Sequence, residues 1–530
     1  MPEIFIIEEY AVTLLLIAIF VGILARRLRM PYTVGLVVVG VVLAILFKES
    51  QIDVGSDLIL GIFVPPIVFE AAFHLPINDL RRNMTPILVL AIAGVLITTF
   101  LVGGIVAWGT DMPIQYAIVF GSIVAATDPV AVIALFKSLG VPKRLQVLLE
   151  GESLLNDGTA IVIFNIAVAA AVTSSFSLRD GIAEFIISAG VGISIGLVLG
   201  ILASLVILRI NDYSIETAVT FILAYGAFVL AESVHVSGVL AVVAAGLVNG
   251  NIGPRGMSPT TRIVVFNFWE FMSFIANSFV FLLIGLVADA TLITNNWQYI
   301  LWGILAALVS RLIVAYGLML PFKSISNSWK HVIFWGGLRG AISLSLVLGI
   351  SNTLEGGVGK QLLAMVFGLV LFTMLVQGTS MDFIIKKLKV VIPRQGRDEY
   401  DYVRALASST RTSFVSLEKV QKQGMMSRHV WDVINNAVDP YTKKLTKDLR
   451  DMVKKYPQAE AEELDAAWRE FLHRQRIVIG ELLADKSINE EVYSELVGRI
   501  DNALQLPEIS WDDIQDLENI FQKNTEEVES

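Results

Sequence analysis

Residues 114–136 read IQYAIVFGSIVAATDPVAVIALF, and a second apolar segment opens shortly afterwards with EGESLLND at residues 150–157. Both segments are long enough to cross a bilayer as helices. Pro129 removes a backbone donor and turns Asp128 away from helical geometry. Because an ionised carboxylate at the centre of a bilayer costs about 2.5–3.5 kcal/mol, acids there mark functional sites. The pattern predicts an interrupted helix that carries a cation site.

The composition is that of an integral membrane protein. Of the 530 residues, 55% are hydrophobic, and the mean hydropathy of +0.68 lies far above that of a soluble domain. The fold class that we expect is an all-α membrane protein with about 13 transmembrane helices. The apolar runs that predict these spans are 10–28, 32–47, 57–73, 86–108, 114–136, 154–173, 181–208, 215–234, 236–250, 264–288, 297–320, 329–351 and 361–380.

The distribution of cations predicts the orientation, because Lys and Arg gather in cytosolic loops. Clusters such as Arg26, Arg27 and Arg29 follow odd-numbered spans, and the intervening loops hold few cations. We expect a multi-pass protein of the cell membrane with the N-terminus outside and the C-terminus in the cytosol. Acids rather than cations precede the first span, which argues against a cleavable signal peptide.

The composition changes near residue 390. About 46 of the last 140 residues are charged, against about 43 of the first 390, so the two parts belong to different environments. We therefore divide the chain into a transmembrane domain over 1–390 and a cytosolic, helical, regulatory domain over 391–530. The acidity of the second part argues against nucleic acid as a partner.

A second interruption is predicted in the span 329–351. Residues 335–341 read WGGLRGA, in which three glycines and Arg339 break an apolar run at mid-depth. This break comes seven spans after the first, so the two broken helices run in opposite directions. Two crossing broken helices in matching halves are typical of inverted-repeat transporters with a site at the crossing.

Asp128 and Asp157 are the candidate ion-binding carboxylates. At 4 Å and an effective dielectric constant of 20, two carboxylates repel by about 4 kcal/mol, so both stay ionised only when a cation lies between them. Protons or a desolvated cation can therefore neutralise the pair, and the two occupants exclude each other. Such competition is a mechanism for exchanging one for the other.

Further oxygen ligands for a hard cation such as Na⁺ are close in the sequence. Ser153 precedes Asp157 by four residues and shares its helix face. Thr127 offers a hydroxyl and a carbonyl that the proline break leaves free. Glu70, near the end of the third span, is a further acid that either joins the site or reaches Arg81 and Arg82.

Three residues are expected to support the site. An unpaired Arg339 in a broken helix is strongly disfavoured, so we expect an ion pair between Glu152 and Arg339. Asn156 is uncharged and cannot add a titrating proton, but it can hydrogen-bond an interrupted backbone. Arg311 and Glu232 form either a second structural pair or two separate residues.

Four motifs together resemble bacterial NhaP-type sodium/proton antiporters of the monovalent cation:proton antiporter superfamily, related to eukaryotic sodium/proton exchangers. They are Phe69-Glu70, Thr127-Asp128-Pro129, the segment 150–158 and the segment 336–341, and they occur in the right order between about residues 10 and 385.

The resemblance implies a NhaA-like fold with inverted repeats, a homodimer, and movement of a core domain against a dimerisation domain. It implies that Asp157 is the essential ion- and proton-binding carboxylate, with Asp128, Ser153, Thr127 and Glu70 nearby. Asn156-Asp157 is similar to the pattern associated with electroneutral exchange. The implied ligands are transported Na⁺ or Li⁺ and H⁺, with no cofactor.

Three other functions fit parts of the pattern. Exchange of K⁺ for H⁺ on the same fold is an alternative, because selectivity depends on cavity size. Paired intramembrane aspartates also occur in aspartic proteases, which are enzymes rather than transporters. A cation channel is a third alternative, and its flux would not be coupled to protons.

Overall fold

The structure is a computed structural model that describes residues 3–28, 31–46, 59–173, 177–210, 212–287, 290–351, 354, 357–391, 397–455 and 457–504. Two compact units, Met1–Ile392 and Pro393–Ser530, divide the chain. The predicted tail over 391–530 falls partly on residues 392–396, 456 and 505–530, which lie outside the described residues, as do the ends of the predicted spans 32–47 and 57–73.

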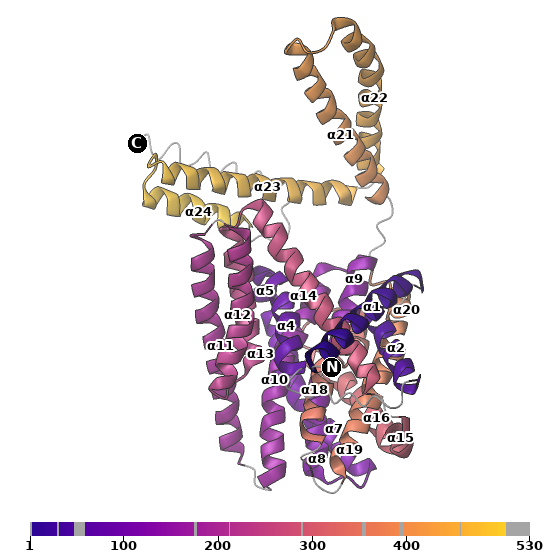
Figure 1. Cartoon of the computed structure of the whole chain (residues 1–530). Helices are drawn as coiled ribbons and strands as arrows, with labels where there is room; N and C mark the ends of the chain where they lie inside the picture. The colour runs from indigo at the N-terminus through magenta and orange to yellow at the C-terminus, as the bar shows by residue number, and fades with distance from the viewer. Residues whose placement is uncertain are drawn as a thin grey trace. The chain divides into compact units, whose positions relative to one another are not determined.

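Helices account for the regular structure of the first unit, and no strand occurs in its described residues (Figure 1). Short π or 3-10 segments, labelled η, continue several helices. The first half of the unit contains α1 (Glu3–Leu28), α2 (Tyr32–Leu46), η1 (Ile59–Phe63), α4 (Val64–His74), α5 (Ile77–Arg82), α6 (Met84–Leu88), η2 (Val89–Gly94), α7 (Val95–Gly109), α8 (Ile114–Ala125), α9 (Val130–Leu139), α10 (Lys143–Thr173) and α11 (Leu178–Ile207).

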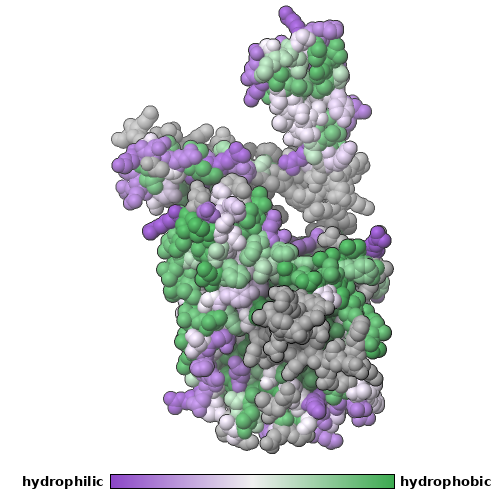
Figure 2. Space-filling view, viewed as in Figure 1, coloured by the Kyte–Doolittle hydropathy of each residue, from purple (hydrophilic) through white to green (hydrophobic). Residues whose placement is uncertain are grey.

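The second half continues with α12 (Tyr213–Ser233), α13 (Gly238–Ile252), η3 (Gly253–Arg255), α14 (Pro259–Leu286), α15 (Ala290–Asn295), α16 (Trp297–Ile313), η4 (Val314–Leu318), α17 (Asn327–Trp335), α18 (Ala341–Ser351), α19 (Val358–Phe372), η5 (Thr373–Gly378) and α20 (Thr379–Lys387). Among the described residues, eight helical stretches are long and apolar enough to cross a membrane, and five apolar helices are shorter. Hydrophobic residues cover much of the visible surface of this unit (Figure 2). The prediction of an all-α membrane protein is confirmed, and the number of crossings stays a prediction.

Both predicted interruptions are present and touch each other. α8 ends at Ala125 and α9 begins at Val130, while α17 ends at Trp335 and α18 begins at Ala341. The backbone N–H of Asp128, in the first break, donates to the carbonyl of Leu338, in the second, over 2.9 Å. Two backbone segments that leave the helical pattern inside the bilayer thus satisfy part of each other's hydrogen-bonding requirement.

Two glycines explain why the second break can pack so closely. A Cβ at Gly340 would collide with the carboxylate of Asp128, and a Cβ at Gly337 would collide with the guanidinium of Arg311. Any side chain at these positions would displace a charged group. The glycines of the segment 336–341 therefore serve close approach at the crossing.

A buried ion pair ties α10 to α16. The guanidinium of Arg311 binds both carboxylate oxygens of Glu152, with Nη2 donating to Oε2 over 3.1 Å, and its Nε donates to the carbonyl of Ile333 over 3.2 Å. Both side chains are buried, at 7% and 1% exposure. The two-pronged geometry and the additional carbonyl bond compensate for the loss of hydration.

The predicted pairing of Glu152 with Arg339 is therefore wrong. Arg339 is buried, but its Nη1 donates to the carbonyl of Ala126 over 3.1 Å, at the start of the first break. Its backbone N–H donates to Thr373 Oγ1 over 3.2 Å. The alternative pairing of Arg311 with Glu232 is also wrong, because Glu232 accepts the backbone N–H of Gly238.

The second unit is helical where it is described. It contains α21 (Arg397–Lys422), α22 (Arg428–Lys455), α23 (Pro457–Ala484) and α24 (Glu490–Leu504). α21 and α22 pack against each other, with the rings of Phe414 and Trp431 stacked at 5.2 Å. Gly424 lies in the connecting turn at φ +76°, a conformation that favours glycine.

Replacement of Arg311 by alanine should destabilise the protein by about 3–5 kcal/mol, because it leaves Glu152 charged and buried without a partner. Thermal unfolding in detergent, followed by tryptophan fluorescence, measures the loss. Lys386→Ala is the matched control, since it removes a Lys386–Asp382 pair whose side chains are 61% and 42% exposed, and such pairs contribute at most about 1 kcal/mol. Equal unfolding temperatures for the two variants would contradict a stabilising role for the buried pair.

Candidate functional site

A cavity of about 290 Å³ lies beside the crossing of the broken helices. It collects polar side chains from helices far apart in the sequence. Its polar lining consists of Glu70, His74, Thr127, Asp128, Lys137, Glu150, Ser153, Asp157, Ser273, Asn277 and Ser343, and apolar residues fill the rest. The five predicted ion-binding residues thus line one cavity, and their role as ligands stays a prediction.

The break between α8 and α9 positions Asp128. Its Oδ1 accepts the backbone N–H of Val130 over 2.9 Å, which holds the carboxylate at the first turn of α9. There it also lies close to the positive end of the helix dipole. The remaining carboxylate oxygen, Oδ2, lies against Gly340 in the other break.

α10 supplies Ser153 and Asp157 on one face. The hydroxyl of Ser153 donates to the carbonyl of Thr127 over 2.5 Å, so this carbonyl is not left free as the sequence predicted. Asn156 Nδ2 donates to the Thr127 hydroxyl over 3.2 Å. Asn156 therefore bonds to the side chain of Thr127 rather than to the interrupted backbone, and Ser153 keeps its own oxygen available as an acceptor.

Two charged groups of opposite sign act on Asp157. The carboxylate of Asp128 repels its negative charge, and the guanidinium of Arg339 attracts it. Glu152, by contrast, is bound to Arg311. Neither Glu152 nor Arg339 lines the cavity, so both support the site from outside its lining.

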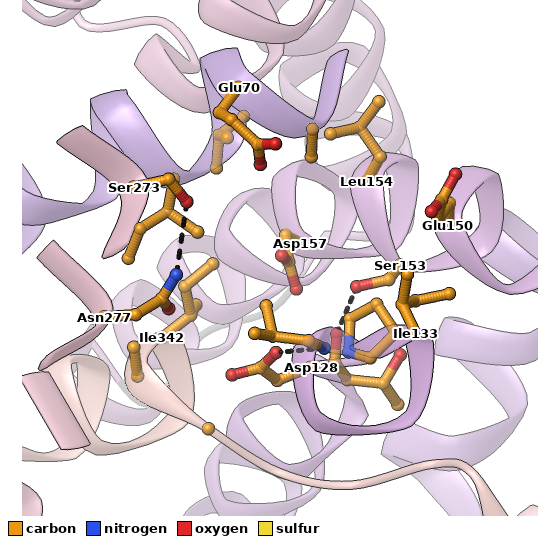
Figure 3. A pocket seen from close by; sticks show the side chains of 18 of the residues that line it. Glu70, Asp128, Ile133, Glu150, Ser153, Leu154, Asp157, Ser273, Asn277 and Ile342 are labelled. Carbon is orange, nitrogen blue, oxygen red and sulfur yellow. Dashed lines mark hydrogen bonds between the residues drawn. The ribbon is translucent and has the colours of Figure 1, made fainter. Parts of the chain in front are cut away.

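The opposite wall of the cavity comes from α4 and α14. In Figure 3, Glu70, Ser273 and Asn277 lie on one side, Asp128 and Ser153 lie on the other, and Asp157 lies between them. Ser273 and Asn277 are each 7% exposed. Sequence reasoning missed both, although their spacing of four residues on an apolar helix places two polar groups on one face.

Charged side chains near the C-terminal ends of α4 and α9 also line the cavity. The carboxylate of Glu70 lies 3.3 Å from His74 Nδ1, and His74 Nε2 lies 3.9 Å from Glu270. Glu70 therefore faces His74 and does not reach Arg81 or Arg82. Lys137 and Glu150 line the same part of the cavity.

The donor set suits a monovalent cation or protons. Two carboxylates face one another with hydroxyl, carbonyl and amide oxygens around them, which are the ligands that hard cations prefer. Among the residues that the structure describes, no three His, Asp or Glu side chains converge as a site for a multivalent metal. Na⁺ here would be a substrate that enters and leaves.

Comparisons with known proteins agree with this architecture. A family model described as "Sodium/hydrogen exchanger, transmembrane" matches residues 14–387. The Na⁺/H⁺ antiporter ApNhaP of Aphanothece halophytica is 38% identical over 439 residues, covering 81% of this chain and 84% of its own length. The Na⁺/H⁺ antiporter NhaG of Bacillus atrophaeus is 32% identical over 500 residues, covering 92% of this chain and 95% of its own length, so that match extends into the second unit.

Solved structures show the same fold. The sodium proton antiporter MjNhaP1 of Methanocaldococcus jannaschii superimposes with a TM-score of 0.63 at 20% identity, covering 73% of this chain and 99% of that protein. This match confirms the predicted antiporter fold, while the inverted repeats and the number of spans stay predictions. With the family model spanning most of the first unit, the chain belongs to the sodium/hydrogen exchanger family.

Proposed function

We propose that the protein exchanges Na⁺ for H⁺ across the cell membrane by alternating access, with both ions competing for Asp157 and Asp128. The observation that carries this proposal is that the two carboxylates line one cavity with Ser153 and Thr127. Relatives that cover most of the chain are named Na⁺/H⁺ antiporters, which supports the choice of ions.

The electrostatics of the pair supports competition. Two carboxylates about 4 Å apart repel by about 4 kcal/mol at an effective dielectric constant of 20, so a doubly ionised site without a cation is disfavoured as the aspartates approach that distance. One cation or a proton relieves the repulsion. Each occupant must leave before the other can be bound, and a protein that reorients only with a neutralised site couples the two fluxes.

The buried charges favour an electroneutral, one-for-one exchange. Asp128 and Asp157 carry two negative charges, the positive charge of Arg339 offsets one of them, and Glu152 and Arg311 neutralise each other. One net negative charge then remains at the two aspartates, and either one Na⁺ or one proton cancels it. Both loaded forms of the site then carry the same charge across the membrane.

The cavity lining indicates the side of the membrane to which the site is open. Its lining extends from Asp157 to His74 and Lys137, near the ends of α4 and α9, where Arg81 and Lys143 follow in the sequence. By the positive-inside rule this face is cytosolic, with the N-terminus outside. The state described here is therefore open towards the cytosol.

The proposal also covers the oligomeric state, the transport of Li⁺ and the role of the C-terminal unit. The antiporter acts as a homodimer, and the two halves of each subunit's transmembrane domain are inverted repeats. It also transports Li⁺. The C-terminal unit, with its acidic and helical composition, regulates transport from the cytosol. Its i,i+4 ion pairs, such as Lys443 with Asp439 at 2.6 Å, fit an aqueous environment.

Asp157→Asn should abolish Na⁺-dependent proton movement, because an amide neither releases a proton nor cancels the charge of Na⁺. Dequenching of a pH-sensitive dye in proteoliposomes measures the exchange, and gel filtration in detergent checks that the variant remains folded. Asp111→Asn is the control, since it removes an exposed carboxylate outside this cavity. Coupled exchange at the normal rate in Asp157→Asn would remove Asp157 from the mechanism.

The initial rate of exchange should not depend on the membrane potential. We expect equal rates when valinomycin and K⁺ clamp the vesicles at zero or at inside-negative potential, because the loaded site is neutral in both directions. A potential-sensitive dye verifies the clamp. Acceleration by an inside-negative potential would contradict the one-for-one stoichiometry.

Uptake of ²²Na⁺ driven by an outward proton gradient should be inhibited by excess unlabelled Na⁺ or Li⁺ and little by K⁺. Smaller cations gain more from a site in which two carboxylates approach each other. Strong inhibition by K⁺, with proton-coupled K⁺ uptake, would favour the K⁺/H⁺ alternative. Ion flux without coupled proton movement would favour a channel.

A further inference from the structure

Asn277 and Ser273 have no role in the function proposed so far, yet both are buried polar groups in a membrane helix. They lie four residues apart on α14, between Phe271 and Phe281 in a largely apolar stretch. A buried amide without partners costs several kcal/mol in an apolar environment. Both side chains line the cavity, where a bound cation or water can satisfy their polar atoms.

The two side chains are hydrogen-bonded to each other, and they line the same cavity as Glu70. Asn277 Nδ2 donates to Ser273 Oγ over 3.2 Å. Because the amide nitrogen is engaged, the amide oxygen of Asn277 is the group left for the cavity. Figure 3 shows Asn277 and Glu70 on the wall that faces Asp157.

This wall belongs to a different group of helices from the carboxylates. α14 packs along α2, where a Cβ at Gly40 would collide with the backbone of α14. It also packs along α4, where the rings of Phe69 and Trp269 lie 4.4 Å apart at an angle of 42°. Asp128 instead lies in the break before α9, and Asp157 lies on α10. A movement of these helices past α14 would separate the two walls.

We propose that Asn277, Ser273 and Glu70 form a second oxygen site for a partly hydrated monovalent cation, which contacts the ion only while the cavity has the form seen here. This inference rests on the proposed function and adds a sided role to it. The α14 oxygens strengthen Na⁺ binding from the face to which the cavity opens. On the other face the ion meets only the oxygens that travel with Asp157.

The chain offers a matched control for this pair. Asn249 is fully buried and donates through Nδ2 to Ser204 Oγ over 3.1 Å, which is also an Asn–Ser hydrogen bond but joins α13 to α11. Neither residue lines the cavity. Asn249→Ala thus removes an equivalent hydrogen bond without removing an oxygen from the ion pathway.

The test compares the KM for Na⁺ on the two faces, in right-side-out and everted vesicles that contain the full chain. Asn277→Ala should raise the KM about tenfold on the face bearing Arg81 and Lys143, the equivalent of about 1.4 kcal/mol, and leave the KM on the other face unchanged. Asn277→Asp should lower the KM on the first face, because it adds a negative charge opposite Asp157. Asn249→Ala should match the wild type on both faces.

Several outcomes would overturn the inference. The inference fails if a folded Asn277→Ala or Asn277→Asp variant has an unchanged KM for Na⁺. It also fails if the KM changes equally on both faces. If Asn277→Ala does not fold, the sign of the Asn277→Asp effect decides. A wild-type protein without any Na⁺-dependent proton movement would instead refute the proposed function, so the two failures are distinguishable.

Discussion

The hydrogen bond between the Asp128 N–H and the Leu338 carbonyl holds together the part of the fold on which the site depends. A helix that breaks inside a bilayer exposes peptide groups that lipid cannot satisfy. Here two breaks are placed against each other, and Ser153 and Arg339 bind the carbonyls of Thr127 and Ala126. The interruption can therefore hold the candidate ion site, because neighbouring side chains complete the hydrogen bonds of its backbone.

Burial of charge imposes the second constraint. Arg311 neutralises Glu152 by direct contact, so this pair is structural. Arg339 instead bonds to a backbone carbonyl and leaves its charge to act on Asp157. Under the proposed one-for-one exchange, Arg339 offsets the charge of one aspartate, although it does not line the cavity.

Much of this arrangement could be predicted from the sequence, because it is encoded locally. The Thr127-Asp128-Pro129 break, the glycine-rich break at 336–341, and the shared face of Ser153 and Asp157 all follow from residue types and helical spacing. The partner of Glu152 could not be predicted in this way. Spacing within a helix fixes which face a residue occupies, but the neighbouring helix that this face meets depends on tertiary packing.

The same limit explains why the place of Asn277 and Ser273 in the cavity was not predicted, although the span that carries them was. Asn277 and Ser273 carry no charge, so hydropathy alone does not separate them from residues that pack between helices. Their proposed role follows from their position across the cavity from Asp157. A site built from two walls, one that holds the carboxylates and one that supplies neutral oxygens, makes affinity depend on which wall faces the ion. Selectivity and sidedness then become properties of helix position rather than of the carboxylates alone.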